Sequence, residues 1–268
     1  MIAGGIELSS VTVGYGDRPV LADFDLRVEP GSFLAVLGPS GCGKSTLLNC
    51  VAGFVRPVRG RACFDGAEIT GPGRERGVVF QRDVLFPWAT VARNLGFALR
   101  AARVPRTERR ERIAELLTAV GLPPEVAGKL PHELSGGMRQ RVGIARALAI
   151  RPRVLLMDEP FGALDAQTRT HMQDLVVDLW QSTGTTIVFV THDVEESIRI
   201  ASDILVLRAD GIVADHLTNP LPRPRPASSL GEFTAYPALR KHLYELLRPP
   251  SSPAPTGSDR PVTTGEHP

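Results

Sequence analysis

A glycine-rich loop that follows an apolar run is the feature of this sequence that most limits its fold. Residues 38–46 read Gly-Pro-Ser-Gly-Cys-Gly-Lys-Ser-Thr and fit the pattern G-x-x-x-x-G-K-[ST]. The residues before the loop, Phe33 to Leu37, are all apolar and predict a buried strand. A helix is expected to begin at Lys44. The alternative is a glycine-rich turn that binds nothing, but the strand–loop–helix context favours binding of a nucleoside triphosphate.

The loop predicts how the phosphates would be held. Glycines allow successive backbone N–H groups to point at one spot, and a helix N-terminus adds partial positive charge. We expect Lys44 to reach the β- and γ-phosphates and the Ser45 hydroxyl to ligate Mg²⁺. The candidate nucleotide-binding residues of the loop are Gly38, Pro39, Ser40, Gly41, Cys42, Gly43, Lys44, Ser45 and Thr46.

A second cluster lies in the middle of the chain. The sequence Leu-Ser-Gly-Gly-Met-Arg-Gln-Arg at 134–141 opens a predicted amphipathic helix that runs to about residue 150. An apolar strand follows at 154–157 and ends in Asp158 and Glu159. The pair could cap the turn before Pro160, but two carboxylates directly after a buried strand favour a metal site. We expect Asp158 to hold Mg²⁺ and Glu159 to orient the water that attacks the γ-phosphate in hydrolysis.

Taken together, these motifs resemble the nucleotide-binding subunit of ATP-binding-cassette (ABC) transporters. The resemblance covers about residues 6–215 and comprises a Walker A loop (38–46), a Q-loop (Gln81), a signature (135–139), a Walker B strand (154–159), a D-loop (162–165) and a switch histidine (His192). It implies an α/β fold of the P-loop NTPase type, with a RecA-like core, an antiparallel β subdomain and a helical signature subdomain at about 90–150. The expected ATPase domain is 1–215.

The resemblance also implies roles for single residues. Gln81 would complete the Mg²⁺ shell and sense the γ-phosphate, and Tyr15 would stack on adenine. A strand-end aromatic that covers the sheet edge is the alternative for Tyr15. His192 follows the apolar run 187–190, at the strand end where ligands sit in open α/β sheets. A lone histidine is more often structural, but the resemblance implies that His192 contacts the γ-phosphate and steadies the attacking water.

The signature implies that two cassettes act together. In the resembling family, a head-to-tail homodimer sandwiches each ATP between the loop of one copy and Ser135, Gly136 and Gly137 of the other. Asp165 of the D-loop belongs to the same expected nucleotide site. Met138 stands where the family usually carries Gln, and its side chain cannot replace the hydrogen bonds of an amide.

The Q-loop region points to a subgroup. Residues 81–88, Gln-Arg-Asp-Val-Leu-Phe-Pro-Trp, followed by Asn94, are similar to bacterial importers of the nitrate/sulfonate/taurine group. This implies an ATPase on the cytoplasmic face of the cell membrane, two copies of a permease and a periplasmic solute-binding protein. Phe86, Pro87 and Trp88 would contact the permease, although Trp88 could instead be a core residue. An importer for another solute or an exporter is the alternative, and a non-transport ABC ATPase or a catalytically silent regulator is less favoured.

Composition agrees with this class. The net charge is +2, and the Arg run at 106–112 alternates with Glu, as on a solvated helix face, so no nucleic-acid partner is expected. Three cysteines without ligand spacing predict neither a disulfide framework nor a metal site. No stretch reaches the roughly 18 apolar residues that span a bilayer. Any membrane role must therefore come through partners.

The remaining segments predict alternating strands and helices, which favours a parallel sheet covered on both faces. A helical stretch at about 91–120 is expected to break at Pro105, with Thr107 as N-cap and Gly121 as stop. Beyond the domain we expect a Pro-rich linker at 216–236, a short helix at 237–248 and a disordered tail at 249–268.

Overall fold

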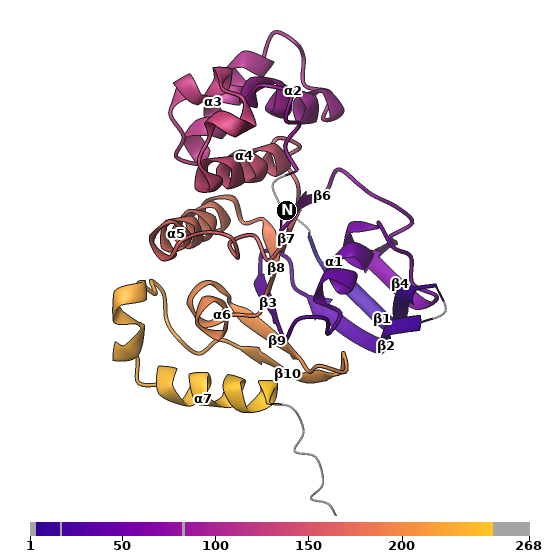
Figure 1. Cartoon of the computed structure of the whole chain (residues 1–268). Coiled ribbons are helices and arrows are strands. Elements are labelled where there is room, and N and C mark those ends of the chain that lie inside the picture. The colour runs from indigo at the N-terminus through magenta and orange to yellow at the C-terminus, as the bar shows by residue number, and fades with distance from the viewer. Residues whose placement is uncertain (1–3, 17, 82–83, 249–268) are drawn as a thin grey trace, which may run out of the picture.

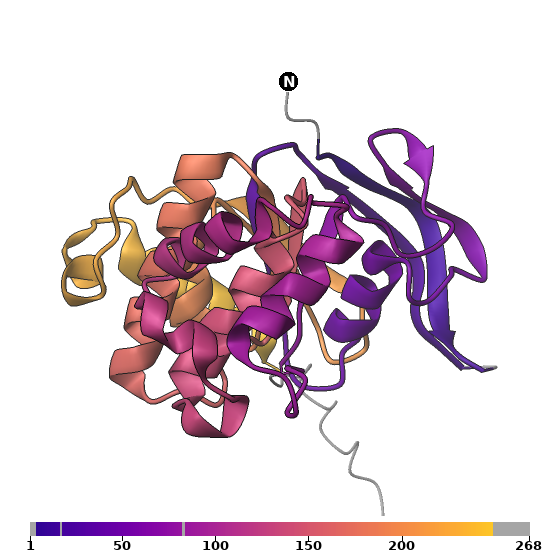
Figure 2. The same cartoon turned by 90° about the horizontal axis from the view of Figure 1, so that it is seen from above.

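The computed structural model describes residues 4–16, 18–81 and 84–248. The expected tail at 249–268 and two residues of the Q-loop segment, Arg82 and Asp83, lie outside the described residues. A central sheet carries a helical subdomain above it and an antiparallel sheet beside it (Figure 1). Seen from above, the antiparallel sheet lies on one side of the helical subdomain and the segment after β10 extends toward the other (Figure 2).

The central sheet has the strand order β10-β9-β3-β8-β7-β6. The strands are β3 (Phe33–Leu37), β6 (Arg76–Val79), β7 (Val154–Asp158), β8 (Thr186–Thr191), β9 (Asp203–Leu207) and β10 (Val213–Thr218). All neighbouring pairs are parallel except β9 and β10, which are antiparallel. The parallel sheet expected from the alternation is confirmed for five strands, and β10 adds an antiparallel edge that the sequence pattern did not predict.

Strand β3 separates two hydrophobic cores because its successive side chains point to opposite faces of the sheet. Phe33, Ala35 and Leu37 pack into the core shared with the helical subdomain, α5 (Ala166–Thr183) and α6 (Val194–Ile200). Leu34 and Val36 pack into the core formed with α1 (Lys44–Ala52) and the antiparallel sheet. A strand buried on both faces has to be apolar at every position, which is why 33–37 has no polar residue.

The antiparallel sheet confirms the expected β subdomain and has the order β2-β1-β4-β5. Its strands are β1 (Ile6–Tyr15), β2 (Arg18–Val28), β4 (Arg59–Phe64) and β5 (Ala67–Glu68). The ladder between β1 and β2 continues to the pair formed by Tyr15 and Arg18.

The helical subdomain contains α2 (Val91–Ala101), α3 (Arg109–Ala119) and α4 (Gly136–Leu148), with 3₁₀ turns at Pro124–Gly128 (η1) and Pro131–Glu133 (η2). The expected N-cap at Thr107 is wrong, because Glu108 holds the cap position and makes no side-chain cap bond. The turn is closed instead by the Glu108 N–H, which donates to the Pro105 carbonyl. Gly121, with a φ of 63°, follows the end of α3 as expected.

The segment expected as a Pro-rich linker at 216–236 packs against the rest of the domain. It begins within β10, continues through a 3₁₀ turn at Ala227–Glu232 (η3) and leads into α7 (Tyr236–Leu247), one residue earlier than predicted. The buried Arg225 guanidinium and the Asn219 amide both donate to the carbonyls of Ile198 and Ala201 at the end of α6. These carbonyls have no partner within their own helix, so the Pro-rich segment satisfies them and stays docked.

None of the helices in the described part of the chain is both long and apolar enough to cross a membrane. The same residues contain no group of three or more His, Cys, Asp or Glu side chains placed to hold a metal ion by themselves.

Candidate nucleotide site

The glycine-rich loop joins the end of β3 to α1, which begins at Lys44 as predicted. Gly43 has a φ of 104°, and a Cβ atom there would lie 2.8 Å from the Leu21 side chain, so only glycine fits. As the N-cap, Gly43 offers no side-chain acceptor to the first turn of α1. The N–H groups at this helix end therefore remain for an anion. The loop opens onto a cavity of about 370 Å³, which is lined by Val20, Ser40, Gly41, Gly43, Lys44, Ser45, Thr46, Gln81 and Glu159.

Lys44 is held inside this cavity by its own loop. Its ammonium donates to the carbonyl oxygens of Gly38 at 2.9 Å and Pro39 at 2.7 Å, and lies 3.7 Å from Glu159 Oε1. The side chain is only 4% exposed. Two backbone carbonyls and the nearby Glu159 carboxylate thus hold the ammonium at the cavity, where it can also contact an incoming phosphate.

Ser45 and Asp158 meet at the expected metal position. The Ser45 hydroxyl donates to Asp158 Oδ1 at 3.0 Å, although Ser45 lies in the first turn of α1 and Asp158 ends β7. Burial raises the pKa of Asp158, against the lowering effect of the Ser45 hydrogen bond. A hydroxyl and a carboxylate are hard oxygen donors of the kind Mg²⁺ prefers, so these residues fit that ion. A bound Mg²⁺ would supply neutralisation of phosphate charge.

The three expected catalytic residues come together around the Glu159 carboxylate. Its Oε2 atom lies 3.2 Å from His192 Nδ1 and 3.4 Å from Gln81 Nε2. Glu159 has a φ of 39°, in the left-handed region that non-glycine residues avoid, and its N–H donates to the Val190 carbonyl of β8 at 3.0 Å. A strained backbone that is held from the neighbouring strand aims the carboxylate into the cavity.

The signature residues lie elsewhere and do not line this cavity. Ser135 is the N-cap of α4, and its hydroxyl accepts from the Met138 N–H at 3.3 Å. Gly137 packs so closely against α5 that a Cβ atom would lie 2.6 Å from Thr168 Cγ2. Ser135 and Gly136 are exposed, whereas the Met138 side chain packs against the core. Within a single chain, the signature and the loop are therefore separate surfaces.

Two further expected residues, Tyr15 and Asp165, do not line the cavity either. Asp165 is the N-cap of α5, and the hydrogen bond from the Thr168 N–H lowers the pKa of its carboxyl. Tyr15 is 57% exposed at the end of β1, and its hydroxyl accepts from Asn49 of α1 at 3.3 Å. Tyr15 thus stands beside the helix that starts at the loop and is largely exposed.

An aromatic surface follows the Q-loop and depends on a residue to which the sequence patterns assigned no role. Asn94 is fully buried; its Oδ1 accepts from the Phe86 N–H at 2.8 Å, and its Nδ2 donates to three carbonyls between Phe86 and Thr90. Phe86 is half-buried against Phe97, at 5.1 Å between ring centroids. Trp88 is 76% exposed, so the core alternative for it is wrong.

This surface carries a hollow of about 620 Å³ that combines aromatic rings with positive charge. Its aromatic residues are Phe86, Trp88 and Phe97, and its charged residues are Arg93, Arg100 and Arg109. It lies on the helical subdomain and is lined by residues 86–89 and by side chains of α2 and α3. We call it the aromatic–arginine groove.

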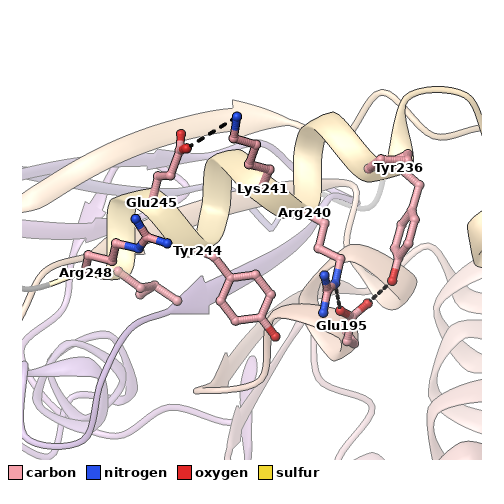
Figure 3. Close-up of a pocket in the computed structure, with 9 residues that line it drawn as sticks. Glu195, Tyr236, Arg240, Lys241, Tyr244, Glu245 and Arg248 are labelled. Atoms are coloured by element: carbon pink, nitrogen blue, oxygen red, sulfur yellow. Dashed lines mark hydrogen bonds and ion pairs between the residues drawn. The ribbon is translucent and has the colours of Figure 1, made fainter.

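Another hollow, of about 900 Å³, lies between α6 and α7 and contains no residue of the nucleotide site (Figure 3). Here the Glu195 carboxylate of α6 accepts from the Tyr236 hydroxyl and the Arg240 guanidinium of α7. Burial raises the pKa of Tyr236 to about 12, with a further contribution from Glu195. This contact attaches the C-terminal helix to the helix that follows His192.

Comparison with known proteins agrees with the fold and the site. The ABC transporter family profile matches residues 21–162. Taurine import ATP-binding proteins are 50% identical in Pseudomonas putida and 48% identical in Yersinia pestis, each over 75% of this chain and 78% or 79% of the relative. A dimeric ATP-binding cassette solved with ADP and Pi superposes with a TM-score of 0.72 at 33% identity, over 81% of this chain and 99% of that one. CbiO1 from Clostridium perfringens, part of the ABC transporter complex cbiONQ, gives 0.74 at 27% identity, over 90% and 96%.

The chain belongs to the ABC transporter family and is an ATP-binding cassette ATPase, whose ATP hydrolysis is coupled to transport.

Proposed function

We propose that the chain is the ATP-hydrolysing subunit of a bacterial importer for a small anion such as taurine, an aliphatic sulfonate or nitrate. The observation that carries the hydrolytic part is the Glu159 carboxylate, which has His192, Gln81 and Lys44 around it and the Ser45–Asp158 pair beside it. The choice of solute is supported by the resemblance of residues 81–94 and by the names of relatives at 48–50% identity.

In this proposal each residue of the site has one task. The loop N–H groups and Lys44 bind the phosphates, and Ser45, Asp158 and Gln81 would hold Mg²⁺. Glu159 accepts a hydrogen bond from the water that attacks the γ-phosphate in line, and His192 holds the same water and phosphate in place. Tyr15 offers its exposed ring to adenine.

The cassette would work as a head-to-tail homodimer. This is supported by the exposed Ser135 and Gly136 at the start of α4, which form an anion-binding helix end away from the loop of their own chain. A second copy brings that helix end to the γ-phosphate, and Asp165 lies at the same interface. ATP is then part of the contact between the two subunits.

The aromatic–arginine groove would receive a permease at the cytoplasmic face of the membrane. Exposed aromatic rings beside arginines suit a short amphipathic helix with an acidic residue. Two permease copies would dock on the two cassettes, and a periplasmic protein would deliver the solute. Phe86 of the groove follows Gln81 by five positions in the chain, and in this proposal a nucleotide that reorients Gln81 also changes the docking surface. No nucleic acid takes part. An importer for another solute, or an exporter, is the alternative.

A Glu159→Gln variant tests the hydrolytic role. We expect it to retain ATP binding, to lose hydrolysis by about 100-fold or more, and to elute as a dimer in size-exclusion chromatography with Mg-ATP. Glu68→Gln, on the exposed strand β5, is the control and should keep wild-type turnover. A Glu159→Gln variant that stays monomeric and hydrolyses ATP at the wild-type rate would contradict the proposal.

The solute is tested separately. The permease that co-purifies with the tagged chain is reconstituted with it in vesicles, and ATP-dependent movement of labelled taurine, an alkanesulfonate and nitrate is measured. Transport of at least one of these anions supports the assignment. Transport of an unrelated solute alone would overturn the assignment of the solute, while the ATPase role would still stand.

A further inference from the structure

A buried carboxylate outside the proposed catalytic set lies one helical turn after His192. Glu196 of α6 is 7% exposed, and both of its carboxylate oxygens accept hydrogen bonds from uncharged groups. Oε2 accepts from the Thr191 hydroxyl, and Oε1 accepts from Gln173 Nε2 at 2.9 Å. Burying a carboxylate is unfavourable, so its presence here calls for a physical role.

Glu196 is hydrogen-bonded to the residues on either side of His192 in the sequence. The Thr191 hydroxyl oxygen, besides donating to Glu196, accepts from the Asp193 N–H at 3.0 Å. Asp193 Oδ1 in turn accepts from the Glu196 N–H at 3.1 Å. The residues immediately before and after His192 are therefore both fastened to Glu196. The His192 side chain is exposed, but the backbone that carries it is fixed on both sides.

The same carboxylate ties this turn to α5. Gln173, which donates to Glu196, accepts from the Arg199 guanidinium, and Arg199 also donates to the Thr170 carbonyl. Asp165 of the D-loop is the N-cap of helix α5. A small cavity of about 50 Å³ is lined by Glu159, His192 and Glu196 together, which places the network directly behind the catalytic groups.

We propose that Glu196 is a positioning residue for ATP hydrolysis: it fixes the 191–193 turn so that His192 Nδ1 faces the Glu159 carboxylate. The inference rests on the proposed role of His192. Glu196 does not reach the reacting atoms in this proposal, and it acts only by holding the backbone that carries the imidazole. A fixed approach of a catalytic group is valuable because small misplacements cost large factors in rate.

A carboxylate suits this position better than an amide. Glu196 accepts on both oxygens, whereas Gln has one accepting oxygen and one donating nitrogen. In a Glu196→Gln variant, the oxygen can still accept from Gln173 or from Thr191, but not from both through separate atoms. The turn then loses one of its fastenings while side-chain volume stays the same.

The test uses the purified full-length chain and steady-state ATPase kinetics. We expect Glu196→Gln to lower kcat by about 5- to 20-fold, with KM for ATP changed less than twofold, because the loop that binds ATP is untouched. Glu195→Gln is the matched control. It makes the same change on the same helical turn, but Glu195 points to Tyr236 and Arg240 of α7 (Figure 3). Its kcat should stay within twofold of wild type.

A double-mutant comparison shows whether Glu196 acts through His192. In a His192→Ala background, Glu196→Gln should cause no further loss of kcat. A wild-type kcat in Glu196→Gln, or a full additional loss in the His192→Ala background, would overturn the inference. A His192→Ala variant with wild-type kcat would instead refute the proposed role of His192, and the inference with it.

Thr191 provides a second route if Glu196→Gln does not fold. Thr191→Ser keeps the hydroxyl that Glu196 binds and should retain kcat within about threefold, whereas Thr191→Val removes it and should fall as Glu196→Gln does. Equal kcat in the two Thr191 variants would overturn the inference.

Discussion

The Glu159 carboxylate lies 3.2 Å from His192 Nδ1 because β7 and β8 are adjacent parallel strands in a fixed register. Asp158 pairs with Val190 across the two strands, so the residues that follow each strand emerge side by side. The carboxyl end of this sheet therefore brings together an expected water-orienting residue and an expected phosphate sensor, which are widely separated in the chain.

Lys44→Ala should weaken ATP binding before it affects any chemical step. The variant loses a buried ammonium that forms charge-assisted contacts with phosphate, and we expect affinity to fall by about 10- to 100-fold. Isothermal titration calorimetry with ATP measures this. Lys129→Ala removes an exposed lysine of the helical subdomain and serves as the control. Unchanged affinity in Lys44→Ala would show that the loop is not the site.

Asn94→Ala should destabilise the chain by about 2–4 kcal/mol, because it leaves the Phe86 N–H and several loop carbonyls without their partner and opens a cavity. Urea denaturation followed by circular dichroism measures the change. Arg93→Ala, an exposed change on the same helix, should stay within about 0.5 kcal/mol of wild type. A similarly small effect for Asn94→Ala would mean that the loop is held by other contacts.

Trp88→Ala should reduce permease binding without affecting the fold. Its ring is 76% exposed, so we expect the melting temperature to shift by less than about 2 °C, while the yield of co-purified permease falls at least about tenfold if Trp88 is an interface anchor. Tyr244→Ala on α7, also an exposed aromatic, should leave the yield unchanged. Undiminished co-purification with Trp88→Ala would place the docking surface elsewhere.

Glu196 should make folding stability depend on pH in a predictable direction. Burial raises the pKa of its carboxyl above the ordinary value of 4.5, although the hydrogen bonds from Thr191 and Gln173 and the charge of Arg169 lower it and Asp193 raises it. As pH rises, Glu196 therefore loses its proton at a lower pH in the unfolded chain than in the folded chain. The protonated Glu196 carboxyl therefore makes its full contribution to folding stability below about pH 4.5, and this contribution is lost as pH rises through the folded-state pKa.

Glu196→Gln lacks this titration. Its stability relative to wild type should therefore rise between about pH 5 and pH 8, whatever constant offset the altered hydrogen bonds produce. Urea unfolding of both proteins across this range measures the difference. A difference that is independent of pH, or that falls with rising pH, would contradict a raised pKa in the folded chain.

Local patterns in the sequence were sufficient for much of the fold. The run 33–37, the glycine loop and the helix start at Lys44 are short-range features, because an apolar stretch, a glycine at positive φ and a helix N-terminus each depend on neighbouring residues. The same holds for the Walker B strand and for the helix that residues 134–141 open. Their order along the chain was enough to indicate a phosphate-binding α/β domain.

The tertiary structure alone decided which distant groups meet. Residues 219–226 dock because Asn219 and Arg225 donate to carbonyls at the end of α6. The Phe86 backbone is held by the Asn94 side chain of α2. Trp88 is exposed because the helical subdomain does not cover it. Glu196 reads in the sequence as an ordinary acidic residue in a first helical turn, and only the packing of α5 against α6 buries it behind His192. Burial and hydrogen-bond partners are decided only when the chain packs. They depend on contacts between segments that are far apart in the sequence, and no local pattern indicates which of these segments meet.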